Sequence, residues 1–100
     1  MRLLPQADEG RRSAEIARHG SMVLKLYSPV GHDPQTPHEQ DELYIVMRGS
    51  GVFRRANELV KFKPGDVLFV EAGVEDRFES FDPDFISWVV FWGPKGGEDR

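Results

Sequence analysis

From residue 21 onward, hydrophobic and polar residues alternate in short runs, which is the pattern of half-buried strands. In the first run Met22, Leu24 and Leu26 are apolar, with Lys25 between them, as expected where successive side chains point to opposite faces. Each later run is short and is bounded by Gly, Pro, Asn or Asp, which favour turns. We therefore predict strands over residues 21–27, 42–48, 51–55, 59–63, 67–70, 76–81 and 85–92. Short strands at this spacing predict one antiparallel sandwich or barrel.

The first twenty residues do not follow this pattern. They are polar, with Ser13 as a plausible N-cap before residues 14–19 and Gly20 as a stop. We predict a short helix or an arm over residues 1–20, followed by a single barrel domain over residues 21–100. Residues 28–37 are rich in Pro and Gly and are predicted to form a loop.

The predicted strand after this loop begins with a row of polar residues. On an extended chain every second side chain faces the same side, and the residues of this row are Thr36, His38, Gln40, Glu42 and Tyr44. An imidazole, an amide and a carboxylate would then face one interior. A buried, hydrogen-bonded histidine is the structural alternative for His38.

Two segments resemble the motifs of the cupin family. The run PHEQDELYIVMRG, residues 37–49, is similar to the first motif, which His38, Glu42 and Gly49 match, with Thr36 where the family has its first metal histidine. The run GDVLFVEAGVEDRFES, residues 65–80, is similar to the second motif, with Asp76 where the family has its last histidine. The resemblance implies an all-β, cupin-type antiparallel barrel, or jelly roll, with a metal site inside it.

On this resemblance the metal ligands are His38, Glu42 and Asp76. An imidazole and two carboxylates suit a divalent transition metal such as zinc, manganese, iron or nickel. Tyr44 follows Glu42 on the same row and is our candidate for a catalytic proton donor. The predicted wall of the substrate pocket consists of Thr36, Gln40, Phe78 and Trp88.

Composition narrows the possible functions. The chain has 100 residues, a formal net charge of -4 and no cysteine. The charge argues against nucleic-acid binding, and the lack of cysteine excludes disulfides and thiolate metal sites. Arg2, Gln6, Asp8 and Glu9 interrupt any apolar run at the start, so we expect neither a signal peptide nor membrane association, and we expect a cytoplasmic location.

Two functions remain open at this point. One is a metal-dependent enzyme of the oxygenase, isomerase or decarboxylase type that acts on a small polar organic molecule. The other is a barrel that binds or senses a small ligand without converting it, with a degenerate metal site. We also predict a homodimer, because an apolar row opposite the presumed interior requires cover; its residues are Val23, Tyr27, Leu43, Ile45 and Met47. The N-terminal segment, with Leu3, Leu4 and Ile16, is the competing cover.

Overall fold

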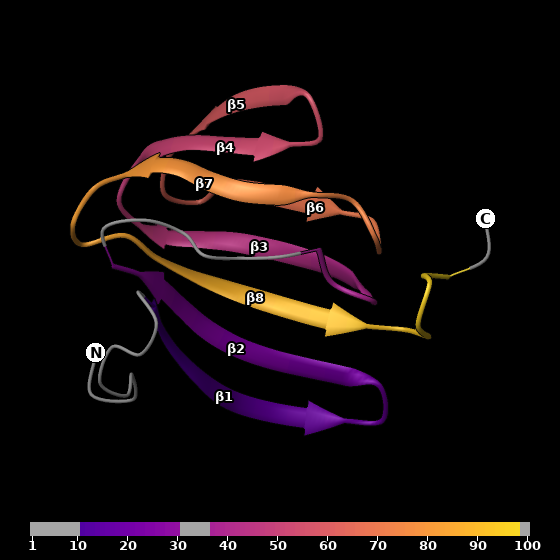
Figure 1. The fold of residues 1–100 in the computed structure, drawn as a ribbon. Coiled ribbons are helices and arrows are strands. Elements are labelled where there is room, and N and C mark those ends of the chain that lie inside the picture. Colours follow the sequence, from indigo (N-terminus) through magenta and orange to yellow (C-terminus); the bar gives the residue numbers. More distant parts are fainter. Residues whose placement is uncertain (1–10, 31–36, 99–100) are drawn as a thin grey trace.

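Within the described residues, eight strands form two antiparallel sheets that face each other (Figure 1). This computed structural model describes residues 11–30 and 37–98. The larger sheet has the strand order β1-β2-β8-β3-β6 and the smaller has the order β5-β4-β7. The strands are β1 (Arg11–His19), β2 (Met22–Pro29), β3 (Asp41–Arg48), β4 (Gly51–Arg55), β5 (Glu58–Phe62), β6 (Val67–Val70), β7 (Asp76–Phe81) and β8 (Ile86–Trp92). The predicted all-β barrel is confirmed.

The short helix predicted over residues 14–19 is wrong, because these residues belong to β1. Strand β1 pairs with β2 along its length, from Arg11 opposite Pro29 to His19 opposite Met22, with a bulge between Glu15 and Ala17. The residues of this stretch are compatible with a helix, but pairing with β2 satisfies the backbone and overrides that weak local preference. Within the described ranges, no helix is long and apolar enough to cross a membrane. The domain boundary at residue 20 stays a prediction.

Strand register shows which side chains of the larger sheet face the interior. Residues directly opposite each other share a face, and Val23 lies opposite Phe91, which lies opposite Glu42. Two residues further along each strand, the next row on the same face consists of Lys25, Val89 and Tyr44, which lie opposite one another. Val23 and Tyr27 therefore face the interior with Glu42, and their predicted place on the outer apolar row is wrong.

The outer face of the larger sheet carries the other apolar row. Leu43, Ile45 and Met47 alternate with Glu42, Tyr44 and Val46 along β3, so they lie on the face away from the interior, as predicted. Ile45 is 37% exposed. Its cross-strand neighbours are Val67 on β6 and Trp88 on β8.

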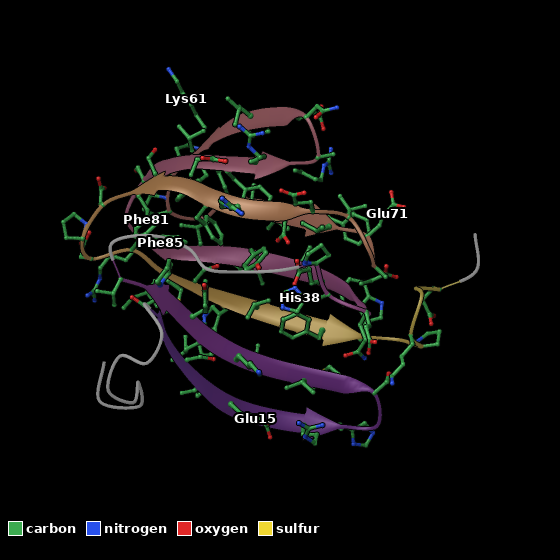
Figure 2. All side chains as sticks on the ribbon, viewed as in Figure 1. Glu15, His38, Lys61, Glu71, Phe81 and Phe85 are labelled. Atoms are coloured by element: carbon green, nitrogen blue, oxygen red, sulfur yellow. The ribbon has the colours of Figure 1, made fainter. Side chains whose placement is uncertain are left out.

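The interior is filled with aromatic rings at one end. Phe78 has its ring centroid 4.6 Å from that of Phe85 and 4.8 Å from that of Phe53, and all three side chains are buried. Figure 2 shows Phe85 and His38 toward opposite ends of the barrel. Gly49 is required beside this core, because its φ is +85° and a Cβ there would lie 2.7 Å from the Cα of Phe85.

Candidate metal centre and adjacent pocket

The segment before β3 is held in place by backbone contacts on both sides. The carbonyl of His38 accepts a hydrogen bond of 2.8 Å from the amide of Gly73, and the carbonyl of Glu39 accepts one of 2.7 Å from Gly96. The Gln40 side chain donates to the carbonyls of Ser21 and Gly93, at 3.1 and 2.9 Å. These contacts fix the position of residue 38 although it precedes the regular strand.

His38, Glu42 and Asp76 converge inside the barrel. One ligand atom from each lies within 4.8 Å of the others. His38 Nδ1 is 3.2 Å from Glu42 Oε2. Glu42 is the second residue of β3 in the larger sheet, whereas Asp76 begins β7 in the smaller one, so the cluster joins the two sheets. Both carboxyl groups are buried, each residue being 1% exposed.

The two buried carboxyl groups affect each other's ionisation. Burial, together with the hydrogen bond and negative charge of Glu42, raises the pKa of Asp76 to about 9, whereas His38 and the hydroxyl of Tyr44 act in the opposite direction. Two carboxylates this close cannot both be charged without a compensating cation. At neutral pH a proton on Asp76 supplies this compensation.

A divalent cation is a second way to satisfy the cluster, and the residues fit one. Asp76 Oδ1 is buried and accepts no hydrogen bond from a described residue. One imidazole nitrogen and two carboxylate oxygens form a donor set suited to a first-row transition metal. Three protein ligands leave coordination positions open, as in catalytic sites. His38, Glu42 and Asp76 are therefore the residues that would hold the ion.

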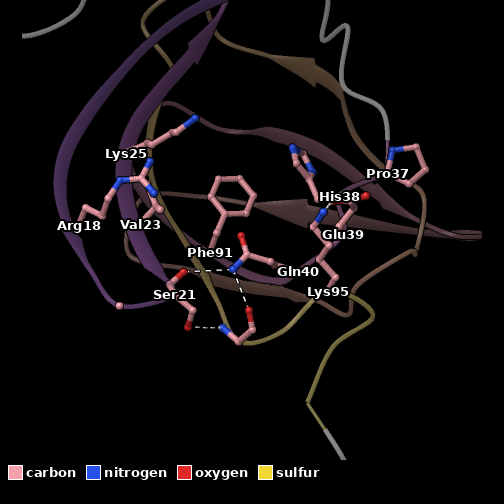
Figure 3. A pocket seen from close by; sticks show the side chains of 12 residues that line it. Arg18, Ser21, Val23, Lys25, Pro37, His38, Glu39, Gln40, Phe91 and Lys95 are labelled. Carbon is pink, nitrogen blue, oxygen red and sulfur yellow. Dashed lines mark hydrogen bonds and ion pairs between the residues drawn. The ribbon is translucent and has the colours of Figure 1, made fainter.

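A pocket of about 610 Å³ lies beside this cluster and shares His38 with it (Figure 3). The side chain of His38 is 33% exposed, so it reaches from the buried carboxylates to the pocket. Its ring centroid lies 4.8 Å from that of Phe91, which forms the apolar floor. Pockets of this volume bind small organic molecules. The remaining lining residues are Arg18, Gly20, Ser21, Val23, Lys25, Pro37, Glu39, Gln40, Gly93 and Lys95.

The other predicted site residues have different positions. Tyr44 is fully buried, and its hydroxyl donates to Asp76 Oδ2 at 3.3 Å. Phe78 packs against Tyr44 with centroids 4.9 Å apart, so it supports the cluster from the core and does not line the pocket. Gln40 does line the pocket, but its amide nitrogen binds backbone carbonyls. Thr36 lies outside the described residues.

The structure does not bring Trp88 to the site. Trp88 lies opposite Leu26 and Ile45, on the outer face of the larger sheet, while its neighbour Val89 faces the interior. Trp88 therefore does not line the pocket beside the cluster. Strand β8 is apolar on both faces, so its sequence carries no signal that separates inner from outer positions.

Two residues that the sequence analysis did not select are prominent in the pocket. Phe91 contacts His38, and Lys25 lies over the same ring with its Nζ 5.8 Å from the centroid. A lysine within an alternating strand is ordinarily assigned to the solvent face. Only the strand register shows that Lys25 faces inward, and a single sequence does not contain that register.

Known proteins that are similar to this chain in fold or in sequence agree with this architecture. KdgF from Halomonas sp. superposes with a TM-score of 0.79 at 15% identity, covering 92% of this chain and 88% of that one. A predicted oxalate decarboxylase from Thermotoga maritima superposes with a TM-score of 0.70 at 22% identity, covering 82% and 79%. In sequence, an uncharacterized protein of Streptomyces coelicolor is 36% identical over 83 residues, 81% of this chain and 79% of that protein. The family model of the cupin domain matches residues 24–89, and the chain belongs to the cupin superfamily.

Proposed function

We propose that this protein is a metal-dependent cupin enzyme that binds a divalent transition metal through His38, Glu42 and Asp76 and acts on a small polar organic molecule in the adjacent pocket. The observation that carries the proposal is the approach of three donor atoms to within 4.8 Å of one another at the edge of a pocket. A metal bound there would polarise an oxygen of the substrate. The oxygenase, isomerase and decarboxylase types all fit this chemistry.

The chain's own residues supply position and shielding. Glu42 and Asp76 are buried and would provide negative charge at fixed points once a bound metal replaces the proton on Asp76, and Tyr44 orients Asp76 through its hydroxyl. Such outer hydrogen bonds hold a ligand in the required orientation. The ring of Phe91 beside His38 excludes water from one side of the pocket.

A non-catalytic binding barrel is the second candidate, and the position of Tyr44 favours it. Tyr44 is our candidate proton donor, yet it is fully buried and does not belong to the pocket lining. A proton donor must reach the reacting group directly or through one water. Incubation of the metal-loaded protein with a bound ligand, followed by mass spectrometry of that ligand, separates conversion from binding.

The metal site is tested by elemental analysis of purified protein with His38→Ala as the variant. We expect stoichiometric metal in the wild type and loss of it in His38→Ala, with unchanged circular dichroism because the core strands do not depend on the imidazole. His19→Ala is the matched control, since His19 is exposed on β1. Stoichiometric metal retained in His38→Ala would refute the assignment.

We also propose that the protein is a homodimer in the cytoplasm. The outer face of the larger sheet exposes a cluster of large apolar residues, namely Ile45, Met47, Val67 and Phe69. Exposed apolar clusters of this kind commonly mark contact surfaces, and two-fold pairing is the most frequent symmetry. Of the residues predicted as the competing cover, Ile16 lies on β1 and is 37% exposed, and Leu3 and Leu4 lie outside the described residues.

A further inference from the structure

The pocket differs in charge from the molecule as a whole. The chain has a formal net charge of -4, whereas the pocket lining has three cationic side chains, Arg18, Lys25 and Lys95, and one carboxylate, Glu39. A concave site lined by one sign of charge concentrates ligands of the opposite sign. The excess of positive charge at this place therefore favours an anionic ligand.

Two of the three cations already have carboxylate partners. Arg18 binds Glu15 at 2.7 Å, and the Lys95 ammonium lies 3.6 Å from Glu39. The Lys25 ammonium forms no ion pair within 4 Å in the described parts of the chain. It lies over the ring of Phe91, and its charge acts at longer range on Glu15, its cross-strand neighbour, whose main partner is Arg18. Lys25 is thus the cation in the lining that is best placed to receive an anion.

The position of Lys25 also relates it to the metal centre. Lys25 is half-buried on β2 and faces the interior in one row with Val89 and Tyr44. The ring of Phe91 contacts Lys25 on one side and His38 on the other, and Figure 3 shows the three side chains along one wall of the pocket. One small molecule on this ring would reach both the ammonium and the candidate metal ligand.

We propose that the ligand is a small organic acid whose carboxylate binds Lys25 while the rest of the molecule lies on Phe91 beside His38. A carboxylate is favoured over a phosphate because the single ammonium of Lys25 balances one negative charge, and phosphate carries more. The apolar residues of the lining, Val23, Pro37 and Phe91, suit the carbon skeleton of such an acid. The inference rests on the proposed function, since it names the substrate class of that site.

The test compares carboxylates with their neutral amides by titration calorimetry. The probes are lactate against lactamide and 2-hydroxybenzoate against 2-hydroxybenzamide, with inorganic phosphate as a separate arm. We expect at least one carboxylate to bind about tenfold or more tightly than its amide, and Lys25→Met to remove that preference. Lys25→Arg retains the charge and should retain the preference. Lys61→Met is the matched control, because Lys61 is exposed on β5, away from the pocket.

Metal content measured on the same samples separates this inference from the proposed function. If Lys25→Met loses carboxylate binding and keeps its metal, both proposals are supported. If the protein holds no metal but still binds carboxylates through Lys25, the metal proposal fails and this one stands. Equal affinity for acids and amides, no carboxylate binding up to about 10 mM, unchanged binding in Lys25→Met, or tighter binding of phosphate than of every carboxylate would overturn it.

Discussion

The two ends of the barrel interior are built by the same strands and are chemically opposite. On β7, Phe78 is in the aromatic core, and Asp76, two residues earlier on the same face, is in the polar cluster. On β3, Val46 is likewise in the core and Glu42 is in the polar cluster, with Tyr44 between them on the same face. Burial of the rings stabilises the fold, whereas burial of two carboxyl groups opposes it. The aromatic end thus provides the stability that offsets the burial of the two carboxyl groups at the polar end.

The largest effect on the free energy of unfolding is expected from a substitution at the aromatic end. Phe78→Ala removes a fully buried ring that contacts Tyr44, Phe53 and Phe85, and should lower the free energy of unfolding by about 3–5 kcal/mol. Urea denaturation of the metal-free protein measures this loss. Leu59→Ala is the control, because Leu59 is 60% exposed on the smaller sheet and its removal should cost far less. Equal losses in Phe78→Ala and Leu59→Ala would show that Phe78 is not central to the core.

A substitution at the polar end is expected to change the free energy of unfolding with the opposite sign. The folded protein holds a proton on Asp76 up to about pH 9, whereas the unfolded chain releases it near its ordinary value of 3.8. The contribution of Asp76 to stability is therefore complete below 3.8 and is lost as the pH rises toward 9. In metal-free protein, Asp76→Asn should remove this decline, because an amide stays neutral.

Denaturation at several pH values between about 5 and 8 measures this difference. Asp84→Asn is the control, since Asp84 is exposed in the turn before β8, and it should keep the wild-type dependence on pH. If Asp76→Asn declines with pH as steeply as the wild type, Asp76 is already ionised in the folded state, and the polar end is not opposed to folding in the way described.

The smallest effect on stability is expected from a substitution on the outer face of the larger sheet. Ile45→Glu should change the monomer's free energy of unfolding by about 0.5 kcal/mol or less, because the side chain is exposed, yet it should convert a dimer into a monomer in sedimentation at micromolar concentration. Leu59→Glu, at a 60% exposed position on the smaller sheet, should leave the dimer intact. A wild-type monomer at that concentration would reject the proposed dimer.

Most of the fold could be predicted because its signals are local. Alternation and turn residues marked each strand from β2 to β8 to within one or two residues, and Gly49 matched a family glycine that the close approach of Phe85 explains. Strand β1 was missed because residues 14–19 lack a strong alternation and are compatible with a helix. Its conformation depends on pairing with β2, which is a long-range contact that local propensity does not encode.

The candidate site was predictable only where a motif marked it. His38, Glu42 and Asp76 were predicted together and lie together. Lys25 and Phe91 belong to no motif, and their inward direction depends on register in strands that are apolar on both faces. Trp88 could not be assigned to a face for the same reason, since an aromatic residue between Ser87 and Val89 gives no indication of its face.

The cluster has a mechanical consequence, because its members come from different sheets. In the described parts of the chain no backbone ladder joins β3 to β7, and besides the cluster the two sheets are linked at this end by residues 71–75, whose Gly73 amide binds the carbonyl of His38. An ion held by Glu42 and Asp76 would act as a removable cross-link between them, closing the stretch of chain from residue 42 to residue 76. The separation of the sheets would then respond to the concentration of free metal, so that occupancy of the site sets how readily this end of the barrel opens.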